Sequence, residues 1–528
     1  MWHVVLSYLK SRWLLFVVLL VFVSFKLSQL HFPFYLDEAW VYAPAVKMMA
    51  IHGPGLLPGA LPPDFSRGHP LMFHFLASIW IRCFGSSNVS VHSFPLFLAV
   101  IFLVALYECC LSLFGRRDAS LALLLVSGSV IFFVQSSFVY PEIMLALFTF
   151  LSLYFYSKDR LLLTSLSLFM LFFTKEGGLV FGAVIGMDAT ACLFRRTETI
   201  WRKLQRVLSV LVPACLIGCF LLLQKAKLGW YILPEHSDMI QTNWNYYYFM
   251  FRRGIYWAYR GETATCIMAL FILLLSVVPA IKNKNARYLF LIPPVVIVYL
   301  MAELYATNPA GSRLWVFLYL LSFAIPVYYL IRLNKDRKLP ERKFIIMAAI
   351  CVLTYLFYSS LTQIGYRYLL VILVLIMIFQ AVSITLFADA GDRRIYYVAV
   401  AGILIINAYG FYSNKRVEDT QMGAFQVMNV QLKEFAFLEK ENAYDKEIAY
   451  GCTWESYRMV DTVQGFLSSG RIFTHLKRFP VGPHADYAMF GNSCGDEADY
   501  RSILTNPDFH LVFKMRDGNI WAEIYKHN

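Results

Sequence analysis

The chain has 528 residues, of which 59% are hydrophobic and only 15% are charged. Soluble domains average about 45–50% apolar and about 25% charged residues, so this composition excludes a single soluble domain and predicts a polytopic membrane protein. The formal net charge of +13 does not indicate a nucleic-acid partner, because residues 1–412 carry 34 Lys and Arg against 18 Asp and Glu, whereas residues 413–528 carry 13 against 16. The excess positive charge belongs to the apolar part, where loop orientation in a membrane explains it.

Apolar runs of roughly 17–22 residues, separated by short charged loops, predict an all-α membrane domain over residues 1–412 with about 13 transmembrane helices. The first run resembles a signal peptide, but no small-residue cleavage site follows it, so we expect an uncleaved anchor. The predicted spans are 12–30, 93–114, 118–138, 141–157, 160–175, 178–194, 206–224, 264–281, 288–305, 314–332, 343–361, 367–387 and 395–412.

The apolar segment 68–84 is left out of these spans because it contains two histidines and an arginine. If it lies flat in the first loop, residues 31–92, then 22 of the 34 Lys and Arg before residue 413 fall on the side of the N-terminus. If it crosses the membrane, every later loop changes sides and the bias reverses. The positive-inside rule therefore predicts a juxtamembrane helix here, a cytoplasmic N-terminus and an extracytoplasmic C-terminus.

Residues 413–528 are more polar and read as a small extracytoplasmic α/β domain. Residues 424–441 are helix-like, 447–451 resemble a strand, and 510–525 resemble a hairpin about Asp517-Gly518. Its two cysteines, Cys452 and Cys494, form a disulfide in one interpretation and remain free in the other.

With this topology, several charged residues collect at the outer ends of the spans. Carboxylates near a membrane are costly and usually serve a function or an ion pair. The acidic pair Asp37-Glu38 leaves the first span directly, which favours chemistry at the membrane surface. The other members of the group are Arg67, His69, Glu142, Lys175 with Glu176, Arg313 and Arg367.

The order of motifs resembles the GT-C superfamily of membrane glycosyltransferases. The similarity is greatest to the branch of the protein O-mannosyltransferases and the bacterial aminoarabinose transferase that modifies lipid A. It covers the first 195 residues well, the region 200–412 loosely, and the tail not at all. The motifs are LDEAW at 36–40, GHPLMFHFLASIWIRCFG at 68–85, the long run at 93–129, YPEIMLALFTFLSLYF at 140–155, LFFTKEGGLVF at 171–181 and, more weakly, GYRYLLVILVLI at 365–376.

The resemblance implies a polyprenyl-phosphate sugar as donor and a lipid, glycan or protein as acceptor. By position, Asp37 is the catalytic carboxylate, and a carboxylate suits the role because the acceptor hydroxyl loses its proton as it attacks the sugar. Glu38 is expected to assist it. The alternative is a hydrated acidic pair that caps the first span.

The donor phosphate needs cationic partners. Lys175 and Arg367 are the best candidates to bind it, since the leaving phosphate carries its own negative charge. For Arg313, only its position at the start of a span supports the same role. Where the resembled transferases have a lysine before a proline, this chain has His69, with Arg67 two residues earlier, so either could take that role. The alternative for each is a side chain that reaches for the membrane interface.

Glu142, together with Glu38, could hold a divalent metal cation or a basic residue beside the donor phosphate; hard oxygen ligands suit such a cation. The alternative for Glu142 is a solvated helix start after Pro141. No cofactor is certain from the sequence.

The function expected is therefore an integral-membrane, inverting glycosyltransferase at the extracytoplasmic face of a bacterial inner (plasma) membrane. A multi-span transporter or lipid flippase is the first alternative, although no internal repeat supports it. A glycan polymerase or ligase is the second, although such enzymes place key residues in a late loop.

Overall fold

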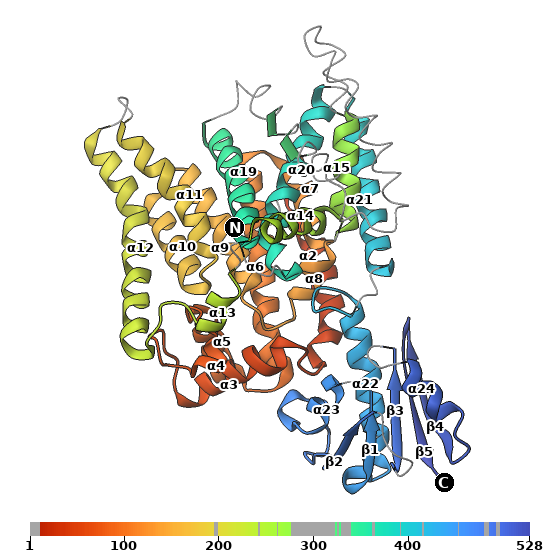
Figure 1. Cartoon of the computed structure of the whole chain (residues 1–528). Helices are drawn as coiled ribbons and strands as arrows, with labels where there is room; N and C mark the ends of the chain where they lie inside the picture. The colour runs from red at the N-terminus through yellow and green to blue at the C-terminus, as the bar shows by residue number, and fades with distance from the viewer. Residues whose placement is uncertain are drawn as a thin grey trace, which may run out of the picture.

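A computed structural model of the chain describes residues 11–194, 199–240, 243–260, 262–275, 323–324, 327–328, 339–361, 365–390, 392–413, 417–451, 453–479, 485–492 and 497–528. A bundle of helices is followed by a small region with a β-sheet, which lies below the bundle in Figure 1. The predicted fold class, an all-α membrane protein with a small C-terminal α/β part, is therefore confirmed.

Among the described residues, six helices are long and apolar enough to cross a membrane. Each falls on a predicted span, which supports an integral membrane protein. They are α2 (Trp13–Leu27) with its following turn, α6 (Asn88–Leu113), α12 (Ile200–Leu228), α19 (Leu339–Ser359), α20 (Leu370–Ala390) with its preceding turn, and α21 (Arg394–Ser413).

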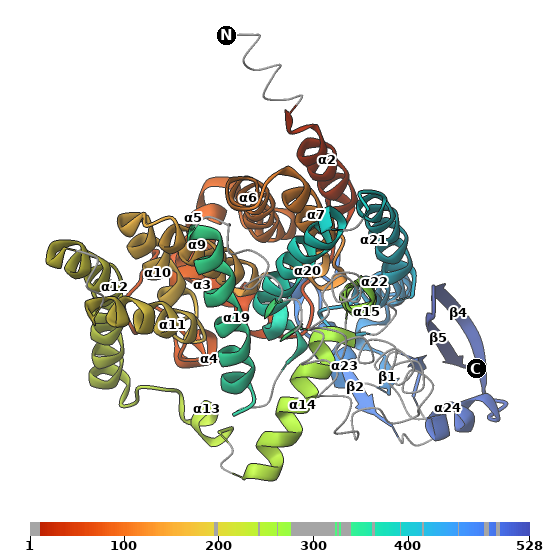
Figure 2. The same cartoon turned by 90° about the horizontal axis from the view of Figure 1, so that it is seen from above.

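Shorter apolar helices occupy most of the other predicted spans. The predicted span at 288–305 lies outside the described residues, as does most of 314–332, so the number of 13 spans stays a prediction. Seen from above, α20 stands inside the bundle and contacts α7, α9, α15, α19 and α21 (Figure 2). The shorter helices are α7 (Arg116–Ser127), α8 (Val130–Gln135), α9 (Glu142–Ser157), α10 (Leu161–Thr174), α11 (Gly178–Ala191) and α15 (Thr263–Leu275).

The run 118–138, predicted as one span, is divided into α7 and α8 at Gly128. A Cβ on Gly128 would come within 1.9 Å of Asn407 Nδ2, and this amide donates to the carbonyl of Leu124 at 3.1 Å. Glu262 accepts hydrogen bonds from the first two N–H groups of α8, those of Val130 and Ile131. The break is stable in an apolar bundle because side chains from elsewhere satisfy the freed backbone groups.

The segment predicted to lie in the first loop forms α5 (Met72–Phe84), which packs against α3 (Ala43–His52). Its 13 residues span only about 20 Å, less than the roughly 30 Å of a bilayer's hydrocarbon core. Two more short helices, α4 (Pro63–Ser66) and α13 (Pro234–Asp238), lie at the same end of the bundle (Figure 1).

Among the described residues, ion pairs join helix ends that border the loops predicted to be cytoplasmic. Each pair links the end of one helix, or the turn just after it, to the start of another. This pairing agrees with the predicted alternation of the spans, while the side of the membrane stays a prediction. The pairs are Arg12 with Glu108, Arg117 with Asp389, Arg202 and Arg206 with Asp159, and Lys343 with Asp188.

The C-terminal region contains the predicted helix as α22 (Gly423–Lys440) and the predicted hairpin as β4 (Phe509–Asp517) and β5 (Ile520–His527). The sheet order is β2-β1-β3-β5-β4, with β1 parallel to both neighbours and β5 antiparallel to both of its own. The helix α22 packs on β4 and β5. The domain boundary at residue 412 stays a prediction, and Cys452 and Cys494 lie outside the described residues. The remaining elements are β1 (Glu447–Tyr450), α23 (Thr453–Met459), β2 (His475–Arg478), β3 (Tyr487–Gly491) and α24 (Glu497–Leu504).

Candidate active site

Arg367 lies at the centre of a charged cluster at the end of the bundle that holds the first loop. It belongs to the 3-10 turn Tyr366–Leu369 before α20. Its Nη2 donates to Asp37 Oδ2 at 2.5 Å and its Nη1 donates to Asp419 Oδ2 at 2.7 Å. Its Nε lies 3.9 Å from Glu142 Oε1. One guanidinium therefore faces three carboxylates from distant parts of the chain.

Lys175, which follows α10, is the second cation. Its Nζ donates to Glu142 Oε1 at 3.0 Å and lies 4.1 Å from the centre of the Tyr368 ring. Glu142 begins α9 and is buried, and its Oε2 has no hydrogen-bond partner among the described residues. We call Asp37, Glu142, Lys175, Arg367 and Asp419 the Arg367 cluster. Its two cations face three carboxylates, so the ionised cluster carries one net negative charge.

Asp37 is the member of the Arg367 cluster that reaches the surface. Its side chain is 49% exposed, compared with 10% for Arg367 and 14% for Asp419. The preceding residue, Leu36, has a φ of +49°, a left-handed conformation that costs a residue with a Cβ about 1–2 kcal/mol. Such strain persists only where the surroundings hold it. This turn sets the direction in which Asp37 leaves the first loop.

Glu38 holds that turn in place. It is fully buried, and its carboxylate accepts hydrogen bonds from the backbone N–H groups of Tyr35 at 3.1 Å and Val139 at 2.7 Å. Its Oε1 also lies 3.0 Å from Nε2 of the buried His92. Because both oxygens are engaged in this way, Glu38 ties the first loop to α6 and to the segment before α9.

A second group of polar residues adjoins the Arg367 cluster through the Lys175-Glu176 peptide. His69 Nδ1 lies 2.7 Å from Glu176 Oε2, and the rings of His69 and His236 are 5.3 Å apart. Burial and the nearby charge of His69 lower the pKa of His236. Arg67 pairs with Glu235 at 3.1 Å. This second group brings the first loop, the turn between α10 and α11, and α13 together.

The sequence-predicted residues thus fall into two neighbouring groups. Asp37, Glu142, Lys175 and Arg367 lie in the Arg367 cluster, Arg67 and His69 lie in the second group, and Glu38 is buried within the first loop. Arg313 lies outside the described residues. Their roles stay predictions. Sequence reasoning missed Asp419, which no motif marks. It placed Glu176 beside Lys175 in the predicted outer turn but gave it no role.

The contacts of Glu38 and Glu142 do not fit a resident divalent cation. Glu142 already faces Lys175 and Arg367, and both oxygens of Glu38 accept backbone N–H groups. The unpartnered Oε2 of Glu142 is a single ligand atom, and within the described ranges no group of three or more His, Cys, Asp or Glu side chains has an arrangement that could hold a metal ion. We therefore assign no step to a metal.

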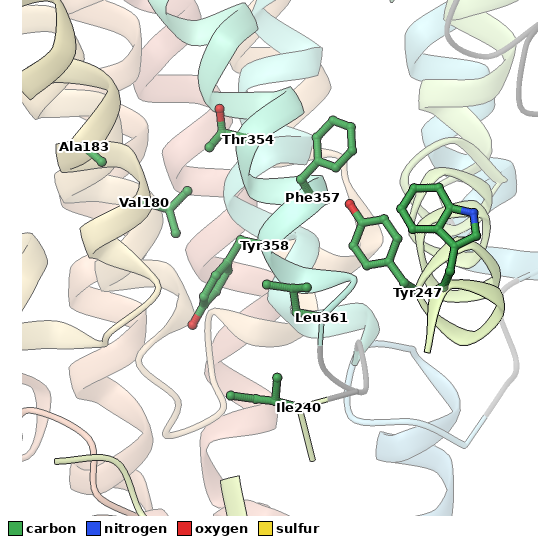
Figure 3. Close-up of a pocket in the computed structure, with 9 residues that line it drawn as sticks. Val180, Ala183, Ile240, Tyr247, Thr354, Phe357, Tyr358 and Leu361 are labelled. Carbon is green, nitrogen blue, oxygen red and sulfur yellow. The ribbon is translucent and has the colours of Figure 1, made fainter. Parts of the chain in front are cut away.

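An apolar cavity of about 690 Å³ opens between α11, α14 (Trp244–Arg260) and α19. Tyr358, Phe357 and Tyr247 project into it (Figure 3). A Cβ on Gly177 would lie 3.9 Å from the Tyr358 ring, so this wall of the cavity is beside the Lys175-Glu176 turn.

Residues 68–173 match the family model of the dolichyl-phosphate-mannose-protein mannosyltransferases. This segment contains three of the motifs on which the predicted resemblance rests and the start of a fourth, so the resemblance is confirmed over it. No curated protein matches the sequence.

The chain also aligns with solved structures at low sequence identity. ArnT from Cupriavidus metallidurans bound to undecaprenyl phosphate is 13% identical, with a TM-score of 0.47 over 99% of this chain and 97% of that one. The oligosaccharyltransferase AglB from Archaeoglobus fulgidus, in complex with an inhibitory peptide and a dolichol-phosphate, is 12% identical, with a TM-score of 0.45 over 87% of this chain and 64% of that one. The arabinofuranosyltransferase AftD from Mycobacteria is 13% identical, with a TM-score of 0.37 over 98% of this chain and 40% of that one.

Proposed function

We propose that this chain, which matches the mannosyltransferase family over residues 68–173, is a GT-C membrane glycosyltransferase. It transfers a sugar from a polyprenyl-phosphate donor to an acceptor, which is a lipid, a glycan or a protein. The observation that carries the proposal is the Asp37–Arg367 pair: a half-exposed carboxylate is hydrogen-bonded to a buried arginine, with a second cation nearby.

Asp37 is the general base in this proposal. The acceptor oxygen forms a bond to the anomeric carbon of the sugar, the bond from that carbon to the phosphate oxygen breaks, and the acceptor proton passes to Asp37. Direct attack inverts the configuration at the anomeric carbon. The hydrogen bond from Arg367 fixes the orientation of the Asp37 carboxylate, which a base needs before it takes a proton. Its exposure leaves room for an acceptor hydroxyl.

Arg367 and Lys175 stabilise the leaving phosphate. The bond cleavage places a second negative charge on the polyprenyl phosphate, and cations in a largely buried site stabilise such a charge more than water does. Arginine also offers the fork of N–H groups that phosphate oxygens prefer. Arg67, His69 and Arg313 remain candidate partners of the same phosphate.

The polyprenyl chain would lie in the apolar cavity beside Tyr358. The cavity is lined mainly by apolar and aromatic side chains of three helices and adjoins the Lys175-Glu176 turn. An apolar lining with a few polar groups at one end is typical of sites for lipid-like ligands. In this arrangement the phosphate reaches the cations while the chain stays among the helices.

The charged groups would face the extracytoplasmic side of a plasma membrane, as the distribution of Lys and Arg in the loops predicts. A reporter enzyme fused after Asn528 tests this. Activity of an extracytoplasmic reporter is expected, and a cytoplasmic signal would contradict the topology.

The function itself is tested with purified protein in lipid vesicles and a panel of polyprenyl-phosphate sugars. We expect one donor to be consumed, with release of polyprenyl phosphate that depends on an added acceptor. A chain that consumes none of the donors, but moves a lipid or solute across the vesicle membrane, would belong to the transporter class instead.

A further inference from the structure

We infer that Asp419 is a positioning residue of this site: it holds the Arg367 guanidinium from one end while Asp37 takes the other. The inference rests on the proposed function and extends it to residues 413–528, a region without any catalytic motif and outside the family match. Asp419 Oδ2 accepts a hydrogen bond from Arg367 Nη1 at 2.7 Å, and its side chain is only 14% exposed.

The backbone around Asp419 is held by the membrane part. Gln135 at the end of α8 donates from Nε2 to the Asp419 carbonyl at 2.8 Å. Two residues earlier, the Val417 carbonyl accepts from the hydroxyl of Tyr35 at 2.7 Å. These two anchors come from the elements that flank Asp37 and Glu142. The carboxylate of Asp419 is therefore placed relative to the same frame as the rest of the site.

The C-terminal region is docked against the first loop at further points. The backbone N–H of Phe34 donates to the Gln464 carbonyl at 2.9 Å, and the rings of Trp40 and Tyr457 meet edge to face with centres 5.4 Å apart. Such contacts hold α23 and the turn after it beside the segment that carries Asp37. Fixed supporting groups of this kind keep a reacting constellation in its productive geometry.

The burial of Asp419 needs a reason, because desolvation raises the pKa of its carboxyl and Arg367 offsets only part of that effect. A costly buried charge with one specific partner often marks a functional site. Arginine has five N–H groups, and those of Arg367 donate to Asp37, Asp419 and the hydroxyl of Tyr368. These contacts fix the orientation of the guanidinium beside the place proposed for the donor phosphate.

A different role is conceivable for the same contact: Asp419 as a displaceable anion that the donor phosphate replaces. The two roles predict opposite effects. A displaceable anion competes with the donor, so its removal lowers the donor KM. A positioning residue mainly affects kcat, since it orders a group that acts in the transition state. The anchored backbone of Asp419 favours positioning.

The test compares Asp419→Asn and Asp419→Glu with Glu418→Gln, which removes the neighbouring exposed carboxylate. Purified full-length variants are assayed with the polyprenyl-phosphate sugar that the wild type consumes. For Asp419→Asn we expect kcat to fall about 10- to 100-fold, as for one lost charge-assisted hydrogen bond, with little change in donor KM. Asp419→Glu should recover part of the rate, and Glu418→Gln should equal the wild type.

Rescue by the conservative variant separates positioning from a merely structural role. Asp419→Glu keeps a carboxylate that can accept from Arg367, so it should recover part of kcat that Asp419→Asn loses, with a normal elution profile for both variants. An unchanged rate, a lower donor KM with a higher rate, or a loss of rate that only accompanies a smaller monodisperse fraction would each overturn the inference. If the wild type consumes no donor, the proposed function fails as well, and that result is distinct from an active wild type with an unaffected Asp419→Asn variant.

Discussion

Arg367→Lys keeps the positive charge of the cluster but removes the fork that reaches two carboxylates at once. The guanidinium donates to Asp37 at 2.5 Å and to Asp419 at 2.7 Å from different nitrogens. A single ammonium on a shorter side chain cannot hold both in these directions. One charge-assisted hydrogen bond is worth about 1.5–3 kcal/mol, so we expect kcat/KM to fall about 10- to 150-fold.

Arg367→Gln removes the charge as well and should be more severe. It leaves Asp37, Glu142 and Asp419 with Lys175 as the one remaining cation of the cluster, and breaking a buried ion pair costs about 3–5 kcal/mol. We expect a lower yield of folded protein in addition to a loss of activity.

The assay measures initial rates of polyprenyl phosphate release in detergent, normalised to the monodisperse fraction on size-exclusion chromatography. Arg82→Lys is the matched control, because Arg82 lies at the exposed end of α5 and bonds only a backbone carbonyl there among the contacts described. An Arg367→Lys variant as active as the wild type would refute the argument that the fork geometry matters.

Three further variants test other parts of the account. Lys175→Met should lower kcat about 10²- to 10³-fold, because it removes a cation from the leaving phosphate, and a normal kcat would exclude that role. Glu38→Gln should lower the free energy of unfolding by about 1–3 kcal/mol, since buried N–H groups lose an ionised acceptor, and an unchanged denaturation midpoint would contradict the structural role of Glu38. Phe357→Ala should raise the KM of a long-chain donor about fivefold, for about 1 kcal/mol of lost apolar contact, while Ile346→Ala on the same helix should not; equal KM values would place the lipid chain elsewhere.

Much of the site could be predicted because its members lie at the ends of helices. Glu142, Lys175 and Arg367 each occupy one end of a recognisable apolar segment, and the loop charges fix which ends share a side. The place of Asp37 could be predicted for the same reason, because it lies just after the first apolar segment. The order of the spans alone therefore predicts which residues lie at the same end of the bundle, even when more than three hundred residues separate them in the sequence.

The sequence could not separate the two members of the acidic pair by their surroundings. Adjacent side chains leave the backbone in different directions, and the left-handed turn at Leu36 decides which of them faces Arg367. The Glu38 side chain leaves the backbone in another direction and is buried. No pattern in the sequence predicts a positive φ at a leucine, so the directions of these two side chains could be seen only in the structure.

Asp419 and the break at Gly128 depend on long-range contacts. Asp419 reaches Arg367 only because the chain after α21 turns back over the first loop, where Gln135 holds it. Similarly, Gly128 interrupts a uniformly apolar run because Asn407 packs against it. The local pattern of apolar residues predicts neither contact. Gln135 and Asn407 lie hundreds of positions from the residues that they hold, and Asp419 also lies in a region without motifs.

The central claim is that Asp37 takes the proton of the acceptor. The most direct measurement is the rate of sugar transfer from a polyprenyl-phosphate sugar by Asp37→Asn, with Asp64→Asn as a control in the exposed part of the first loop. Loss of a general base predicts a decrease of about 10²- to 10⁴-fold in kcat with a normal elution profile and an unaffected control. Undiminished transfer by Asp37→Asn would contradict the account.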